Sequence, residues 1–82
     1  MYYVYVLRSK KDNSLYIGYS TNIKKRIIEH NKGKSRYTKS KIPLELIYCE
    51  IYIDKKDAKG REIFLKSGGG WRFLKKQLRN TL

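Results

Sequence analysis

The sequence predicts a small α+β fold in one domain, residues 1–82. Short runs of aromatic and β-branched residues, which are typical of strands, stand near the start and in the middle of the chain. Between and after them lie segments whose apolar residues recur every three or four positions, as on one face of a helix. The order of these segments mixes strands and helices.

Residues 2–7 and 15–19 predict a β-hairpin near the start of the chain. The first run, Tyr-Tyr-Val-Tyr-Val-Leu, is typical of a buried strand, and the polar residues between the two runs are turn formers. Gly18 is expected to end or bulge the return strand. Such a hairpin would set Tyr5 and Tyr16 side by side.

A first helix is expected to begin after a cap at Thr21 or Asn22 and to run to about Asn31. Gly33 follows as a helix stop. The apolar side of this helix would carry Ile23, Ile27 and Ile28.

The second half of the chain predicts one strand and two helices. Residues 32–42 form a basic loop, and residues 44–53 are apolar at most positions, as in a central strand. A helix capped by Asp54 would follow and run to Lys66, where the three glycines at 68–70 would break it. A last helix over residues 71–79 would bury Trp71, Leu74 and Leu78.

The charge of the chain points to a polyanionic partner. Twenty Lys and Arg face seven Asp and Glu, which gives a formal net charge of +13. Such a field attracts nucleic acid, with a merely charged surface and an anionic membrane as weaker alternatives. The single cysteine, Cys49, is expected to be a buried strand residue. Neither a leader peptide nor an apolar run long enough for a membrane span is visible, so a cytoplasmic location is expected.

Glu62 is the residue that points most directly at chemistry. It shares a helical face with Ala58 and Leu65, where an apolar side chain would be expected. An inward carboxylate is costly unless it is paired, protonated or bound to a metal. A salt bridge to Arg61, Lys66 or Arg26 is the structural alternative to a functional role.

Two further pairs of residues are candidates for a site. Arg26 and His30 lie one helical turn apart, so they can bind a phosphate and move a proton together, although each is also common as a structural residue. The phenols of Tyr5 and Tyr16 are poor bases near their reference pKa of about 10, so a neighbouring cation or a metal-bound water would be needed to make them useful.

These residues occur in an order that resembles the GIY-YIG nuclease family. Tyr3-Val4-Tyr5 matches its first triplet loosely and Tyr16-Ile17-Gly18 its second in full. The segments 22–31, 34–38 and 61–68 are also similar, so the resemblance covers essentially the whole chain. It is closest to the small stand-alone bacterial members, which are similar to the nuclease domains of structure-specific endonucleases and of the excinuclease C subunit.

The resemblance implies a small three-stranded antiparallel sheet flanked by helices, with the active site on one face of the sheet. It implies that Tyr16 activates or orients the attacking water, that Tyr5 supports it and contacts the phosphate, and that Arg26 stabilises charge. His30 would assist proton transfer, and Glu62 would ligate one divalent cation, Mg²⁺ or Mn²⁺.

The implied function is a metal-dependent endonuclease that hydrolyses DNA in repair, recombination or processing, directed by structure rather than by sequence. A non-catalytic basic module that binds DNA or RNA is the alternative, and a protein partner or a dimer is left open. Tyr3 stands where the family has Gly, and Tyr19 stands where excinuclease-type domains often have Lys. The residues expected to contact nucleic acid are Lys34, Arg36, Tyr37, Lys39, Lys41, Lys66, Arg72, Lys75, Lys76 and Arg79.

Overall fold

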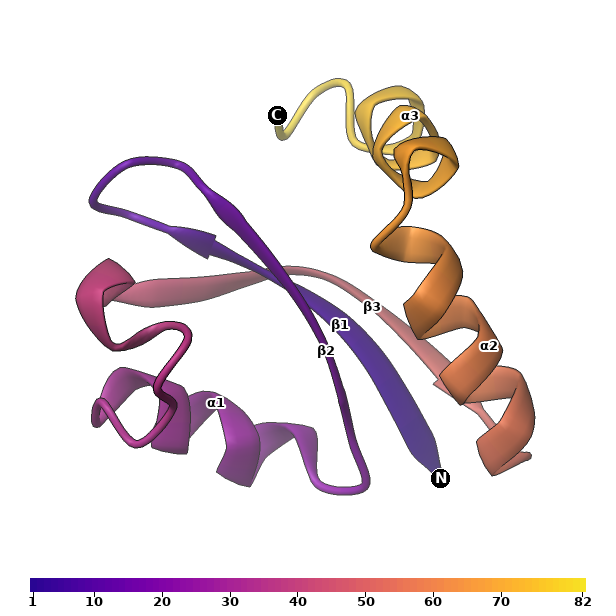
Figure 1. The fold of residues 1–82 in the computed structure, drawn as a ribbon, viewed down its shortest axis with the longest axis horizontal. Coiled ribbons are helices and arrows are strands. Elements are labelled where there is room, and N and C mark those ends of the chain that lie inside the picture. Colours follow the sequence, from indigo (N-terminus) through magenta and orange to yellow (C-terminus); the bar gives the residue numbers. More distant parts are fainter.

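The structure, a computed structural model that describes residues 1–82, contains three strands and three α-helices with one short 3₁₀ helix. In chain order they are β1 (Tyr2–Ser9), β2 (Leu15–Ser20), α1 (Ile23–Asn31), η1 (Lys39–Lys41), β3 (Leu44–Tyr52), α2 (Lys55–Leu65) and α3 (Gly68–Gln77). The strands form one antiparallel sheet in the order β2-β1-β3 (Figure 1). The predicted α+β class and the three-stranded antiparallel sheet are therefore confirmed. None of the helices is long and apolar enough to cross a membrane.

The central strand is β1, so the prediction that residues 44–53 form the central strand was wrong. Four consecutive residues of β1, from Val4 to Leu7, have no exposed surface, because helices cover both faces of that strand. In β3, by contrast, Leu46 is 43% exposed and Ile51 is 59% exposed. An apolar sequence of this kind therefore occurs here at a sheet edge, where part of it faces solvent.

The two faces of the sheet are covered by different helices (Figure 1). Val4 and Val6 pack against side chains of α2 and α3, whereas Tyr5 and Leu7 pack against Ile23 and Ile27 of α1. Alternation along β1 explains this division, because successive side chains point to opposite faces. The face that carries Tyr5 is therefore the face that α1 covers.

The first helix begins and ends where the sequence indicates. The Asn22 side chain accepts a hydrogen bond from the Lys25 amide at 3.1 Å, which caps α1. Gly33 takes a positive φ of 75° just after the helix. Ile28, however, is 47% exposed, so the expectation that it lies on the buried side was wrong. It is one residue beyond Ile27, a rotation of about 100° that turns it away from the sheet.

The three glycines were predicted to break a helix, but instead they form the first turn of α3. The chain leaves α2 at Lys66 instead, and the Ser67 hydroxyl caps α3 by accepting from the Gly70 amide at 3.2 Å. A Cβ at Gly70 would lie 2.2 Å from the carbonyl oxygen of Phe64. Glycine is therefore needed here because α3 starts directly against the end of α2.

Candidate active site and nucleic-acid surface

A buried row of three side chains lies between β1, α1 and the following loop. The hydroxyl of Tyr5 is 3.1 Å from Nε2 of His30, and Nδ1 of His30 is 2.7 Å from the hydroxyl of Thr38. Tyr5 and His30 have no exposed surface, and Thr38 is 1% exposed. Both ring nitrogens of the only histidine are thus occupied, which fixes the orientation of the imidazole.

Gly18 makes room for this arrangement. It pairs directly with Tyr5 across β1 and β2, and the Tyr5 ring lies over its Cα. A Cβ at Gly18 would be 2.3 Å from the phenol oxygen, which no ordinary packing tolerates. The glycine of the second triplet is therefore required by the position of the tyrosine of the first.

Tyr16 joins the row from the adjacent strand. It pairs with Leu7, two residues along from the pair of Tyr5 and Gly18, so the two tyrosines lie on one face but are not directly opposite. Its ring centroid is 5.0 Å from that of His30, with the planes at 62°. His30 therefore lies against both tyrosines, and Tyr16, which is only half-buried, is the nearer to solvent.

The protonation states follow from burial and from Arg26. Burial raises the pKa of Tyr5 to about 12, although Arg26 beside the phenol opposes the rise. Burial and the charge of Arg26 lower the pKa of His30 below its ordinary value, so the ring is neutral at pH 7. Tyr5 is therefore protonated at neutral pH, and its hydroxyl lies within hydrogen-bonding distance of Nε2 of His30.

Arg26 and Glu62 approach this row from two sides. Arg26 lies on α1, is 34% exposed in its side chain, and makes a 3.4 Å contact with Glu29. Glu62 comes from α2, the helix on the other face of the sheet, and its charge is one of the causes that raise the pKa of Tyr5. The candidate residues therefore come from elements that cover opposite faces of the sheet, Arg26 from α1 and Glu62 from α2.

The inward carboxylate of Glu62 is paired with lysines. It is 15% exposed and lies 3.1 Å from Nζ of Lys66 and 3.8 Å from Nζ of Lys59. The suggested bridge to Lys66 is thus present, whereas Arg61 bonds to Glu50 instead. Both lysine ammonium groups are about half-exposed at the ends of flexible side chains, so either can move away from the carboxylate.

The donor set around Glu62 fits a hydrated hard cation. No three His, Cys, Asp or Glu side chains gather anywhere in the structure as a complete ligand set. Mg²⁺ keeps several waters and takes one or two carboxylates together with substrate phosphate oxygens. One partly exposed carboxylate matches that requirement, and Glu62 is the residue that would hold the ion.

The basic residues predicted to contact nucleic acid fall into two groups on opposite sides of the sheet (Figure 1). In the loop after α1, Lys34, Arg36 and Tyr37 are exposed, Tyr37 at 78%, and Lys39 at the start of η1 is exposed too. Lys41 in η1 is less available to contact nucleic acid, because it forms an ion pair with Asp12. The other group lies on α3 and at the ends of α2 and α3, and its members are Lys66, Arg72, Lys75, Lys76 and Arg79.

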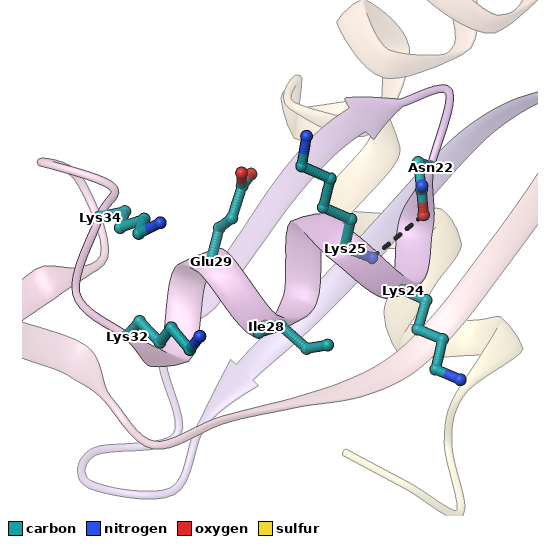
Figure 2. Close-up of a pocket in the computed structure, with 7 residues that line it drawn as sticks. All are labelled: Asn22, Lys24, Lys25, Ile28, Glu29, Lys32 and Lys34. Carbon is teal, nitrogen blue, oxygen red and sulfur yellow. Dashed lines mark hydrogen bonds between the residues drawn. The ribbon is translucent and has the colours of Figure 1, made fainter.

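A basic hollow on the outer side of α1 was missed by sequence reasoning. Figure 2 shows its lining, which encloses about 370 Å³ and consists of Asn22, Lys24, Lys25, Ile28, Glu29, Lys32 and Lys34. The hollow connects to the candidate site, because Glu29 in its wall contacts Arg26. Four lysines within ten positions of the sequence were the available signal. Thr38 was also missed as a partner of His30.

Comparisons with known proteins agree with these features. Residues 1–70 match the family model described as the GIY-YIG catalytic domain. The chain is 46% identical over 67 residues to a UPF0213 protein of Staphylococcus haemolyticus, a match that covers 80% of each chain. It is 43% identical over 67 residues to a UPF0213 protein of Clostridium perfringens, covering 80% of this chain and 71% of the relative.

A solved structure shows the same fold. The solution NMR structure of a UPF0213 protein from Bacillus halodurans is similar to this one with a TM-score of 0.58 at 33% sequence identity. The match covers 94% of this chain and 85% of that chain.

Proposed function

Because the chain belongs to the GIY-YIG catalytic domain family, we propose that it is a metal-dependent endonuclease that hydrolyses DNA phosphodiester bonds. The observation that carries the proposal is the grouping of Tyr16 and Arg26 around the buried pair of Tyr5 and His30, with the charge of Glu62 close enough to affect the pKa of Tyr5. An arginine, a phenol and a carboxylate with some exposure are the groups that a phosphodiester and its attacking water would require.

The partly exposed residues are assigned to the substrate. Arg26 binds the phosphate and offsets the charge that builds up as the water attacks in line. Tyr16 orients that water. A divalent cation held by Glu62, when bound, supplies charge neutralisation at the phosphate and at the leaving oxygen.

The buried residues are assigned a supporting role. Tyr5 and His30 have no exposed surface, so the direct contact of Tyr5 with phosphate that the resemblance implies would require the site to open. With its pKa near 12, Tyr5 stays protonated at neutral pH, so it serves as a donor and not as a general base. His30 holds that phenol and packs against Tyr16, and so positions the tyrosine that orients the water.

The basic surface is assigned to the DNA backbone. The hollow on α1 adjoins Arg26 through Glu29, and the loop after α1 carries further exposed cations. Phosphate contacts position a duplex or a strand without reading its bases. The proposal therefore includes recognition of DNA structure, as expected of an enzyme in DNA repair, recombination or processing.

The test is cleavage of labelled single-stranded, duplex, flap and branched DNAs in Mg²⁺, in Mn²⁺ and in EDTA. Glu62→Ala should lose cleavage while keeping DNA binding within a few-fold. Glu45→Gln is the control, because Glu45 is a partly exposed carboxylate paired with Arg8 at 2.8 Å in another part of the sheet. It should cut as the wild type does.

Two results would contradict the assignment. Metal-dependent cleavage that survives in Glu62→Ala would show that another group or a contaminant is responsible. Binding without cleavage in every condition would favour the alternative, a non-catalytic DNA- or RNA-binding module, for which the basic hollow on α1 is the supporting observation.

A further inference from the structure

An apolar pocket lies at the β2 edge of the sheet, where α2 meets α3. It encloses about 350 Å³. That volume is at the lower end of the roughly 300–1,000 Å³ found for small-molecule sites. Its apolar walls are Leu15, Tyr16, Ile17, Leu65, Trp71 and Leu74. The recess therefore suits one small, flat, largely apolar group.

Trp71 offers that group an aromatic face. It is the only tryptophan of the chain and is 48% exposed, although it lies on a helix whose other apolar side chains are packed. Nζ of Lys75 lies 5.8 Å from the centroid of its ring, which adds a cation at the rim. An indole left half in water beside a recess is the type of surface on which a planar ring stacks.

The pocket adjoins the proposed active site through two shared residues. Tyr16 lines the pocket and also lies against His30, with 5.0 Å between the ring centroids. Lys66 lines the pocket and also pairs with Glu62 at 3.1 Å. A group that fills the pocket would therefore lie next to the residues assigned to the reacting phosphate.

The polar groups of the pocket favour a partner with phosphates and provide no means of reading base edges. The Ser67 hydroxyl is already used, since it donates to the Phe64 carbonyl at 2.5 Å and accepts from the Gly70 amide at 3.2 Å. Apart from the phenol of Tyr16, which is assigned to the attacking water, and the indole of Trp71, the lining offers the cation Lys66. Exposed Arg72 and Lys75 stand nearby on α3. Apolar walls with a cationic rim complement a base and its phosphates without a requirement for base identity.

We propose that this pocket binds one unpaired nucleobase of the DNA strand, next to the phosphodiester that is cut. The inference rests on the proposed nuclease function and specifies its substrate class, which is DNA with an unpaired nucleotide at the cleavage position. A base inside a duplex would first have to leave its stack, which costs free energy that an end, a flap or a single strand does not require. Fully paired DNA is therefore a poor substrate.

The test measures binding separately from cleavage. In EDTA, a single-stranded oligonucleotide should quench the fluorescence of Trp71, whereas a blunt duplex of equal length at equal salt should not. One abasic nucleotide is moved along the strand. At a single position it should weaken binding roughly 5- to 150-fold, the range expected for the loss of one stacked base, and elsewhere it should have little effect.

Variants at Trp71 test whether the sensitive nucleotide of the strand is the one that contacts the pocket. Trp71→Leu should weaken binding of the intact strand by a similar factor but should have little further effect on the strand with the sensitive abasic site, because both changes remove one contact. Trp71→Phe keeps an aromatic face and should bind nearly as the wild type does. Thermal unfolding of each variant shows whether it is folded, and the abasic series tests the pocket in the unaltered protein.

The outcomes separate the two proposals. Equal binding of duplex and single strand, an abasic series without a sensitive position, or fully additive losses would overturn the pocket assignment even if Mg²⁺-dependent cleavage is found. Quenching and non-additive losses in EDTA, without cleavage in Mg²⁺, would support the base pocket and overturn the nuclease.

Discussion

At the scale of single residues, the candidate site depends on close packing around one tyrosine. The Tyr5 ring lies over Gly18, its hydroxyl reaches His30, and Thr38 holds the other side of the imidazole. Each contact fixes the next, so a small displacement of the ring would alter the whole row. The glycine of the triplet thus matters for the space it leaves open, since its φ lies outside the positive range.

Gly18→Ala tests this packing. The added Cβ forces the Tyr5 ring to move, and overpacking of this type costs about 1–3 kcal/mol of folding free energy. We expect a loss of that size in chemical unfolding, together with a loss of DNA cleavage. Gly60→Ala is the matched control, because a Cβ there meets nothing within 4 Å inside α2, and it should stabilise the fold by about 1 kcal/mol. A Gly18→Ala protein as stable and active as the wild type would contradict this account.

At the scale of elements, a second network fixes α2 on the sheet and so determines where Glu62 lies. Glu50 on β3 accepts from Arg61 at 2.9 and 3.1 Å and from the hydroxyls of Tyr48 and Tyr52 at 2.7 and 2.6 Å. The Arg61 guanidinium also lies over the ring of Phe73, 4.5 Å from its centroid. Because Arg61 directly precedes Glu62, these contacts orient the turn of α2 that carries the candidate metal ligand.

Glu50→Gln should therefore destabilise the fold in a pH-dependent manner. Burial alone would raise the pKa of Glu50, but hydrogen bonds from Arg61 and the two tyrosines outweigh it and lower the pKa below 4.5. A carboxyl group whose pKa is lower in the folded than in the unfolded state stabilises the fold. This contribution is fully present above pH 4.5 and is lost as the pH falls through the folded-state pKa. At pH 7 we expect a loss of about 2 kcal/mol in the variant, and the gap from wild type should close in strong acid.

Urea unfolding of both proteins between pH 7 and pH 3 measures this difference. Glu45→Gln removes a more exposed carboxylate that pairs with Arg8, so it should cost less than about 1 kcal/mol. A gap between wild type and Glu50→Gln that stays constant across the pH range would show that the charge of Glu50 does not contribute in the way described.

The sequence predicted those elements that depend on neighbouring residues. The hairpin, the Asn22 cap and the Asp54 cap are determined by local turn and capping chemistry, and the structure has all three. The order of the strands depends on packing between distant segments and was predicted wrongly. The start of α3 was also predicted wrongly, because three consecutive glycines indicate a helix break, whereas here the Ser67 cap starts a helix with them. The side-chain contacts that position the candidate site were not predicted either, because they join residues far apart in the sequence. The Tyr5 hydroxyl meets His30, 25 positions away, and the Glu50 carboxylate that holds α2 meets Arg61, 11 positions away.

At the scale of the whole molecule, the formal charge of +13 is distributed over both sides of the sheet. Charge alone would make any polyanion bind, and the affinity would then depend on net charge and not on position. The hollow on α1 predicts a different behaviour, because its lysines line one surface whose Glu29 contacts Arg26, and they would contact particular phosphates. The salt dependence of binding distinguishes these cases, since its slope counts the phosphates that the protein neutralises.

Replacing Lys24 and Lys25 by Ala and, in a second protein, Lys55 and Lys56 by Ala lowers the formal charge from +13 to +11 in both. The first pair lines the hollow, whereas the second is exposed at the start of α2 on the other side of the sheet. For duplex DNA in EDTA, we expect the slope of log affinity against log salt to become shallower by roughly 1.8 in the first protein, the value for two lost phosphate contacts. The second protein should keep the wild-type slope. Equal changes in both proteins would mean that the basic surface acts only through its overall charge, and the hollow would then have no specific role in holding the DNA backbone beside Arg26.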